Sequence, residues 1–321
     1  MENGRSVRLK CSRYISCFLQ PVTAVGYLEQ TRLHPCYILP GSAISPEHPD
    51  SRTIPVMPNN ILSLLPVATV ILIISTTLPG AGTSQAADLE REQRLADEIV
   101  EAILDGEPVM LTADGHEFLG IYTPAESEPE HGAAIILHGR GMHPDWAQIV
   151  NPLRVELPAR GWSTLSLQMP VLEKDASFYE YVEILPEAIP RITAAIRYLQ
   201  AQGSKHITLI AHSCGVHMSM AWVEQHGTAG IDAYIGIGMG ATDYQQPMRK
   251  PFPFGKIRVP LLNIVGSEDY PAVQRQAKAL ESLLNDLPPG SAQVRIEGAG
   301  HYFDNQNEAL VETVIDWLDT L

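Results

Sequence analysis

The sequence predicts a single α/β domain in which helices cover both faces of a mostly parallel central sheet. Short β-rich runs alternate with amphipathic helical runs along most of the chain, which is typical of such a sheet. Two runs, at 133–137 (AAIIL) and 207–211 (ITLIA), are almost entirely apolar, as strands buried on both faces are. The composition, 45% hydrophobic and 18% charged, excludes a disordered acidic chain.

The expected elements begin with an acidic helix over 89–104. Strands are expected at 117–122, 133–137, 163–168, 206–211, 233–238, 261–265 and 293–297. Helices are expected near 145–160, 184–202, 214–226, 271–286 and 305–320. Ligands of open parallel sheets bind beyond the carboxyl ends of the strands, so a functional site is expected in the loops that follow them.

The N-terminal region differs in composition from the rest of the chain. Residues 61–78 (ILSLLPVATVILIISTTL) are uncharged and mostly aliphatic, and small residues follow them up to Ala87. This pattern predicts a signal peptide over 57–87, translation from Met57 rather than Met1, and a non-native or disordered extension at 1–56. The α/β domain at 88–321 is then exported to the periplasm. A retained membrane anchor at 61–78 is the alternative, because this segment is just long enough to span a bilayer.

Charge and cysteine content narrow the possible partners. The net charge of −15 argues against nucleic acid and anionic lipid surfaces. Cys214 is the one cysteine in 88–321, so no disulfide forms within that domain. No group of side chains has metal-ligand spacing, and no cofactor is expected. The expected partner is a small-molecule or acyl substrate, with no stable protein partner implied and a membrane only if the apolar segment is retained.

A serine occupies an expected sharp turn between a strand and a helix. The strand at 206–211 runs into His212, Ser213 and Cys214, and a helical pattern follows at once. Such a turn exposes the serine hydroxyl, and small residues on either side, here Ala211 and Gly215, let strand and helix approach. Ser213 is therefore the expected nucleophile, and a helix-capping role is its alternative. Cys214 is expected to present its backbone to the site, because it lies one position past the turn.

A serine hydroxyl needs a base, and the base needs a carboxylate to orient it. The last expected strand is followed by a glycine-flanked His301, and the strand at 261–265 by a tight turn that ends in Asp269. The order Ser, Asp, His along the chain is the one that folds with this strand-to-helix serine turn have. His301 and Asp269 are thus the expected base and acid. Asp243, in a looser loop, is the alternative acid.

The strand at 133–137 ends in a glycine-rich turn, His138 to Met142. Glycines let backbone N–H groups turn inward, where they stabilise the oxyanion of an acyl transfer. The expected donors are the backbone N–H groups of Arg140 and Cys214. The aromatic segments 170–186 and 239–258 are expected to wall the substrate pocket, or else to cover the core. The direction of the Arg140 side chain is left open.

From about residue 133 onward the chain resembles the α/β-hydrolase superfamily of the serine hydrolase type. The motifs H-G-x-G, A-x-S-x-G, G-x-x-D and G-x-G-H carry the resemblance in that order. The stretches LHGRGMHPDW and GWSTLSLQMPVL are similar, more narrowly, to an uncharacterised group of exported proteobacterial members. The resemblance implies a serine esterase-like mechanism through Ser213, His301 and Asp269, and it does not specify a substrate. The expected function is acyl transfer from a carboxylic ester or thioester. A non-catalytic exported binding protein on the same scaffold is one alternative, and a membrane-tethered interaction protein is another.

Overall fold

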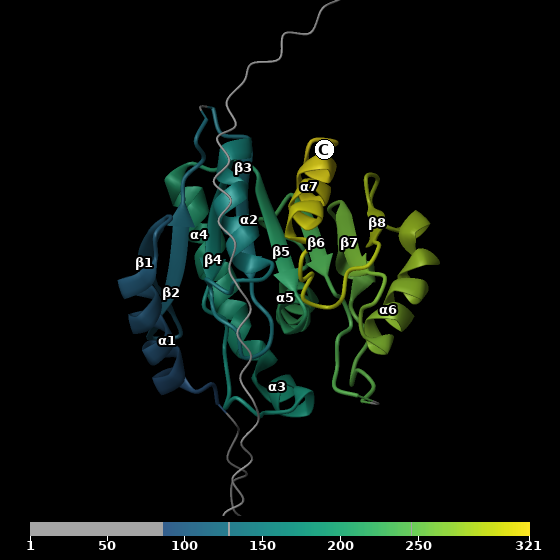
Figure 1. Cartoon of the computed structure of the whole chain (residues 1–321), viewed down its shortest axis with the longest axis horizontal. Helices are drawn as coiled ribbons and strands as arrows, with labels where there is room; N and C mark the ends of the chain where they lie inside the picture. Colours follow the sequence, from purple (N-terminus) through teal and green to yellow (C-terminus); the bar gives the residue numbers. More distant parts are fainter. Residues whose placement is uncertain (1–85, 128, 245) are drawn as a thin grey trace, which may run out of the picture. The chain divides into compact units, whose positions relative to one another are not determined.

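The computed structural model describes residues 86–127, 129–244 and 246–321. Within them, eight strands form one sheet in the order β1-β2-β4-β3-β5-β6-β7-β8, seen from left to right in Figure 1. The strands are β1 Glu107–Ala113, β2 His116–Thr123, β3 Gly132–Leu137, β4 Trp162–Leu167, β5 Ile207–His212, β6 Ala233–Ile237, β7 Leu261–Gly266 and β8 Ala292–Ile296. β2 pairs antiparallel with β1 and β4, and the pairings from β4 to β8 are parallel.

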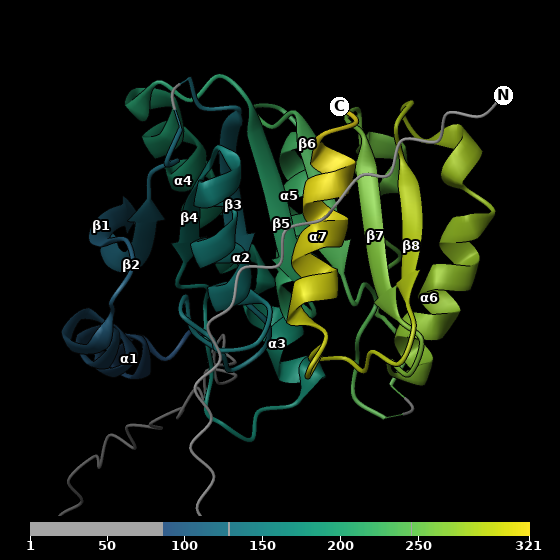
Figure 2. The same cartoon turned by 45° about the horizontal axis from the view of Figure 1, so that its top comes forward.

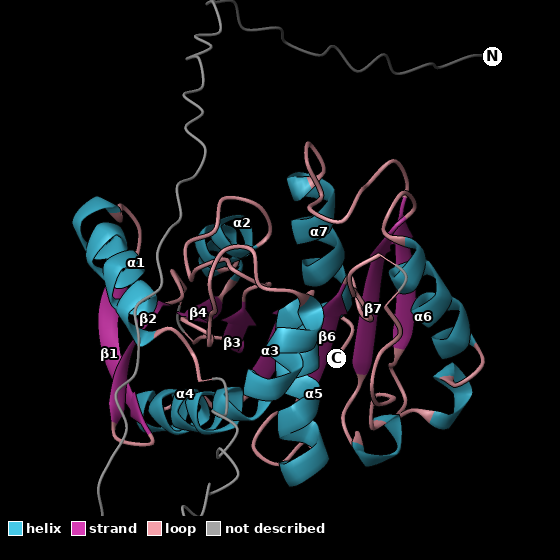
Figure 3. Ribbon diagram, turned by 90° about the horizontal axis from the view of Figure 1, so that it is seen from below, coloured by secondary structure: helices cyan, strands magenta, loops and turns pink. Residues whose placement is uncertain are grey.

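Helices lie on both faces of this sheet (Figures 2 and 3). They are α1 Leu89–Ala102, α2 Val150–Glu156, α3 Phe178–Ile184, α4 Ala188–Gln202, α5 Cys214–His226, α6 Pro271–Glu281 and α7 Asn307–Leu318. Short 3-10 segments are Pro158–Arg160, Leu185–Glu187, Phe254–Lys256 and Leu284–Asp286. None of the described helices is both long and apolar enough to cross a membrane. The expected extension at 1–56 and the apolar segment at 61–78 lie outside the described residues.

The central strands are buried on both faces. Ile135 on β3 packs with α4 and α5 in one core, whereas the next residue, Ile136, packs with α2 and α7 in the other. Successive side chains of a strand point to opposite faces, so a strand between two helical layers needs apolar residues at every position. This explains the uninterrupted apolar runs at 133–137 and 207–211 and confirms the predicted fold class.

Several element boundaries differ from those predicted. β1 was not expected, because it is an edge strand on which Leu111 is the one buried residue. Helix α2 covers only 150–156 of the expected 145–160, and Pro158 begins a 3-10 turn directly after it. Helix α3 forms where a pocket wall was expected, and it starts at a capping box between Ser177 and Glu180. Pro186 then separates it from α4.

A buried ion pair docks α1 on the rest of the domain. The Arg191 guanidinium on α4 donates to both oxygens of Glu92 on α1, at 2.7 and 3.2 Å, and to the carbonyl of Gln168 at 3.0 Å. The backbone N–H of Val171 donates to Glu92 as well. Burial raises the pKa of Glu92, whereas the charge of Arg191 and its hydrogen bonds act in the opposite direction. The pair ties α1 to α4 and to the loop that follows β4.

The buried pair predicts an asymmetric response to mutation. Arg191→Met leaves the Glu92 carboxylate buried without its partner, which should lower the free energy of unfolding at pH 7 by about 3–5 kcal/mol. The double variant Glu92→Leu, Arg191→Met removes both charges and should lose clearly less. Urea unfolding followed by circular dichroism measures both, and a double variant less stable than the single one would contradict the prediction.

Candidate active site

Ser213 lies at the junction of β5 and α5 in a strained backbone conformation. Its φ is 54° and its ψ is −115°, and α5 begins with the next residue. A positive φ is costly for a residue with a side chain, and such strain persists only where the surrounding structure enforces it. Gly215 is part of that enforcement: a Cβ there would lie 2.7 Å from the His138 carbonyl oxygen and 2.9 Å from that of Leu137. The first turn of α5 therefore rests on the end of β3.

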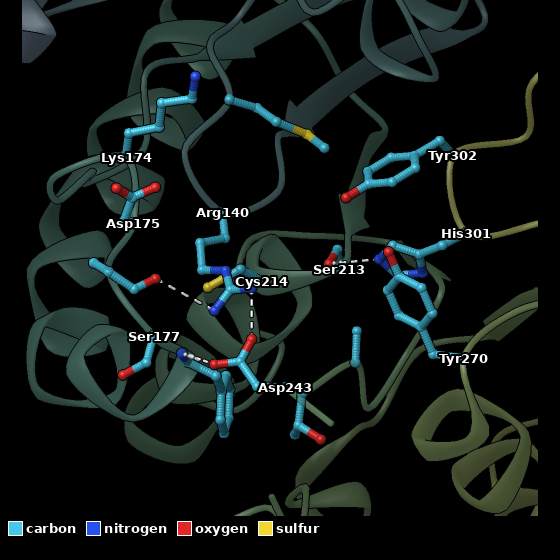
Figure 4. Close-up of a pocket in the computed structure, with 15 residues that line it drawn as sticks. Arg140, Lys174, Asp175, Ser177, Ser213, Cys214, Asp243, Tyr270, His301 and Tyr302 are labelled. Atoms are coloured by element: carbon cyan, nitrogen blue, oxygen red, sulfur yellow. Dashed lines mark hydrogen bonds and ion pairs between the residues drawn. The ribbon is translucent and has the colours of Figure 1, made fainter. Parts of the chain in front are cut away.

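The structure brings Ser213, His301 and Asp269 into one hydrogen-bonded chain. Figure 4 shows the bond between Ser213 and His301. The His301 Nε2 atom is 2.8 Å from Ser213 Oγ, and its Nδ1 atom is 2.7 Å from Asp269 Oδ1. With a carboxylate at Nδ1, the neutral imidazole carries its proton there, and Nε2 accepts from the serine hydroxyl. His301 and Asp269 are buried, so water competes little for these bonds.

The loops that carry these residues meet at the carboxyl edge of the sheet. Ser213 follows β5, Asp269 follows β7 and His301 follows β8. The Glu268 N–H donates to the Ala299 carbonyl at 2.9 Å, which joins the Asp269 loop to the His301 loop. A Cβ on Gly266 would lie 2.2 Å from that same carbonyl oxygen, so the two loops can come this close only with glycine at position 266. The close packing of the turns after β7 and β8 thus sets the distance between the imidazole and the carboxylate.

The alternative acid, Asp243, has different partners. It pairs with the Arg140 guanidinium at 2.6 Å, and its second oxygen accepts from the Phe178 N–H at 2.7 Å. Partial burial acts to raise the pKa of Asp243, but the bonds from Arg140 and Phe178 outweigh it and hold that pKa below its usual range. The carboxylate next to His301 is that of Asp269. The Arg140 side chain, whose direction the sequence left open, lines the pocket.

Arg140 and Cys214 follow neighbouring strands. Arg140 comes after β3 and Cys214 opens α5 after β5, and these two strands pair in parallel. Both residues line the pocket that contains Ser213. The Cys214 thiol is buried, and burial raises its pKa to about 12. It is therefore protonated at neutral pH and a poor nucleophile.

Three buried histidines hold the backbone around the site. His138 donates from Nδ1 to the Gly139 carbonyl at 2.8 Å and accepts from the Met169 N–H at Nε2. His212 donates to the carbonyl of His301 at 3.1 Å, and His217 donates to that of Ala241 at 2.9 Å. Burial lowers the pKa of His138 to about 3, that of His217 to about 4, and that of His212 well below 6.5. These neutral rings hold in place the loops whose carbonyl groups they bind.

A pocket of about 430 Å³ opens beside Ser213. Its lining residues are Arg140, Met142, Lys174, Asp175, Ala176, Ser177, Phe178, Ser213, Cys214, Ala241, Thr242, Asp243, Tyr270, His301 and Tyr302. The described residues contain no group of three His, Cys, Asp or Glu side chains placed to hold a metal ion.

Both expected segments do wall the pocket, through residues 174–178 and 241–243, but most of their aromatic rings do not line it. Of the rings in segments 170–186 and 239–258, Phe178 alone lines the pocket. Tyr181 is buried and its hydroxyl accepts from the Leu172 N–H, Phe252 packs against the core, and Tyr244 is 84% exposed. Tyr181 and Phe252 therefore cover the core, which was the alternative, whereas Tyr244 neither packs in the core nor lines the pocket.

Sequence reasoning missed the two tyrosines that do line the pocket. Tyr270 and Tyr302 each follow a residue of the hydrogen-bonded chain, Asp269 and His301. Both stay partly exposed, at 42% and 38%. Their position one residue after the expected acid and base was the available signal, since a loop that presents one side chain to a cleft carries its neighbour to the same region.

Comparison with solved structures identifies the fold. A dienelactone hydrolase from Anabaena variabilis is 17% identical over 66% of this chain and 96% of its own, with a TM-score of 0.52. An esterase from Pyrococcus furiosus is 16% identical over 67% of this chain and 91% of its own, also at 0.52. Est1E from Butyrivibrio proteoclasticus is 16% identical over 66% and 97%, at 0.50. The chain has the α/β-hydrolase fold.

Sequence comparisons give less information. A family described as "Protein of unknown function (DUF3530)" matches residues 75–186, which is less than half of the chain. No curated protein matches the sequence.

The buried neutral histidines predict a loss of stability in acid. Because the folded-state pKa values of His138, His212 and His217 lie below 6.5, the unfolded chain binds protons that the folded chain does not. The histidines contribute fully to the free energy of unfolding above about pH 6.5. Below that pH their contribution should fall by on the order of 1 kcal/mol per pH unit for each group toward pH 4. Urea unfolding at several pH values measures this slope. His217→Gln keeps a donor for Ala241 without titrating and should give a shallower slope; an unchanged slope would refute the assignment.

Proposed function

We propose that the protein is a serine hydrolase that transfers the acyl group of a carboxylic ester or thioester to water. The observation that carries the proposal is the chain of hydrogen bonds from Ser213 through His301 to Asp269, at the wall of an open pocket. Two proteins of similar fold, an esterase and a dienelactone hydrolase, support this reaction class. The resemblance to exported proteobacterial members belongs to the same proposal.

The geometry suits two successive acyl transfers. As Ser213 Oγ bonds to the substrate carbonyl carbon, its proton passes to His301 Nε2, and Asp269 stabilises the imidazolium. The backbone N–H groups of Arg140 and Cys214 stabilise the negative carbonyl oxygen. His301 then gives the proton to the leaving alcohol or thiol, whose bond to the carbonyl carbon breaks. Water attacks the acyl-serine with His301 again as the base, which releases the acid and restores the hydroxyl.

A non-catalytic binding protein on this scaffold is the rival proposal, and covalent labelling separates the two. A fluorophosphonate probe reacts with a serine only when a base activates it. Intact-mass measurement of the purified protein should show one adduct, located on Ser213 by peptide mapping. An unlabelled protein, or an adduct elsewhere, would favour the rival.

Substitutions should rank the proposed catalytic residues. Ser213→Ala should lower kcat by on the order of 10⁴-fold or more, and Asp269→Asn by roughly 10³–10⁴-fold through loss of the correct His301 tautomer. Asp243→Asn should lower kcat less than about tenfold, because its carboxylate contacts Arg140 rather than the imidazole. Cys214→Ala keeps the backbone N–H and should retain most activity. Steady-state kinetics with one ester, on variants of matched circular dichroism, decides the order, and a greater loss for Asp243→Asn would move the acid to Asp243.

Export with cleavage near residue 87 is a further part of the proposal. The Ala87 N–H points at both oxygens of the Glu187 carboxylate, at 3.2 and 3.3 Å. A free α-ammonium group at Ala87 would form an ion pair there. Mass spectrometry of the natively expressed protein should therefore find an N-terminus at Ala87 or Asp88. Recovery of the uncleaved apolar segment with the membrane fraction would instead support an anchor.

A further inference from the structure

The pocket beside Ser213 has two unlike sides (Figure 4). On one side of the serine lie charged side chains from three loops: Arg140, Lys174, Asp175 and Asp243. On the other side lie His301 and the tyrosine rings of residues 270 and 302. One side is charged and the other is aromatic. The two sides therefore suit chemically different groups of a substrate.

The aromatic side is organised around the imidazole. The Tyr270 ring stacks on His301, with ring centroids 4.3 Å apart and planes 27° apart. The Tyr302 ring meets His301 edge-on, at 5.2 Å and 73°. Burial, and the neighbouring Tyr302 hydroxyl, raise the pKa of Tyr270, so the Tyr270 hydroxyl stays uncharged at neutral pH. Two partly exposed rings therefore offer flat apolar surface on the side where the proton is transferred.

The charged side is held by a fixed ion pair. Asp243 links the Arg140 guanidinium to the first N–H of α3, and Arg140 also donates to the Ala176 carbonyl at 3.4 Å. With Lys174 and Asp175, the side carries two positive and two negative groups. Because the positive and negative groups are equal in number, an acyl group with a net charge would gain little electrostatic attraction on this side. A long alkyl chain would cover charges and remove water from them, which is unfavourable.

The chemistry of acyl transfer decides which substrate group lies on which side. The leaving oxygen must come within hydrogen-bonding reach of His301 Nε2 to receive the proton. Its substituent therefore lies beside the imidazole and against the two tyrosine rings. The acyl substituent, on the opposite side of the carbonyl carbon, extends toward Arg140 and Asp243.

We propose that Tyr270 and Tyr302 form a subsite for an aromatic leaving group, and that the substrate is an ester of an aromatic alcohol with a short, polar, uncharged acyl group. The assignment rests on the proposed serine hydrolase function and adds to it the substrate class. Aromatic pairs contribute beyond the area that they bury, because the negative face of one ring attracts the positive edge of another.

The test compares two alcohols of nearly equal size and reactivity on one acyl group. Benzyl glycolate and cyclohexylmethyl glycolate differ in the aromaticity of the ring, so their kcat/KM ratio reports on the subsite and not on leaving-group ability. We expect a preference for the benzyl ester of at least about threefold. Benzyl glycolate should also be hydrolysed faster than benzyl hexanoate.

Variants locate the preference on the two rings. Tyr270→Leu and Tyr302→Leu should each reduce the benzyl preference, and the double variant should abolish it, whereas the two Tyr→Phe variants should keep it. Tyr244→Leu, at an exposed tyrosine outside the lining, is the matched control and should keep the ratio. A disturbed His301 would slow both esters and leave the ratio unchanged.

The outcomes separate the two proposals. Equal hydrolysis of both glycolates, a benzyl preference that survives the double Leu substitution, or faster hydrolysis of the hexanoate would overturn the subsite while leaving the hydrolase intact. Absence of fluorophosphonate labelling at Ser213, together with no hydrolysis of any of the three esters, would overturn the proposed function and the subsite with it.

Discussion

Close backbone contact at the carboxyl edge of the sheet is the constraint on which the site depends. The start of α5 rests on the end of β3 because residue 215 has no side chain, and the loop after β7 rests on the loop after β8 because residue 266 has none. The first contact holds Ser213 at a positive φ. The second sets Asp269 beside His301. A side chain at either glycine would push apart loops that are joined by hydrogen bonds of 2.7, 2.8 and 2.9 Å.

Buried polar groups around this edge are held in defined charge states. The histidines at 138, 212 and 217 are neutral, and each satisfies a backbone carbonyl of a loop near the site. Glu92 and Arg191 pair with each other, and they link α1 to the loop after β4. Arg91 on α1 also reaches the carbonyls of Leu172 and Gly141. The N-terminal helix, far from Ser213 in sequence, thereby supports the loop that carries Arg140.

In the proposed hydrolase, specificity and reactivity arise from neighbouring residues on the same loops. The loop after β7 supplies Asp269 and then Tyr270, and the loop after β8 supplies His301 and then Tyr302. The charged side draws on loops after β3, β4 and β6. Because each loop follows a rigid strand, changes in loop sequence can alter the pocket while the strands keep the hydrogen-bonded chain in place.

The sequence by itself determined the fold class and the residues that meet at the strand ends. Apolar runs such as AAIIL report burial on both faces, and the parallel order places Ser213, Asp269 and His301 at one edge wherever the loops are short. Tertiary structure alone decided the rest: the edge strand β1, whose alternation is weak; the pairing of Asp243 with Arg140; and the polar pocket with its two tyrosines. The physical reason is that the direction of a loop side chain depends on contacts between segments 30 to 100 residues apart, such as Phe178 with Asp243, which no local pattern records.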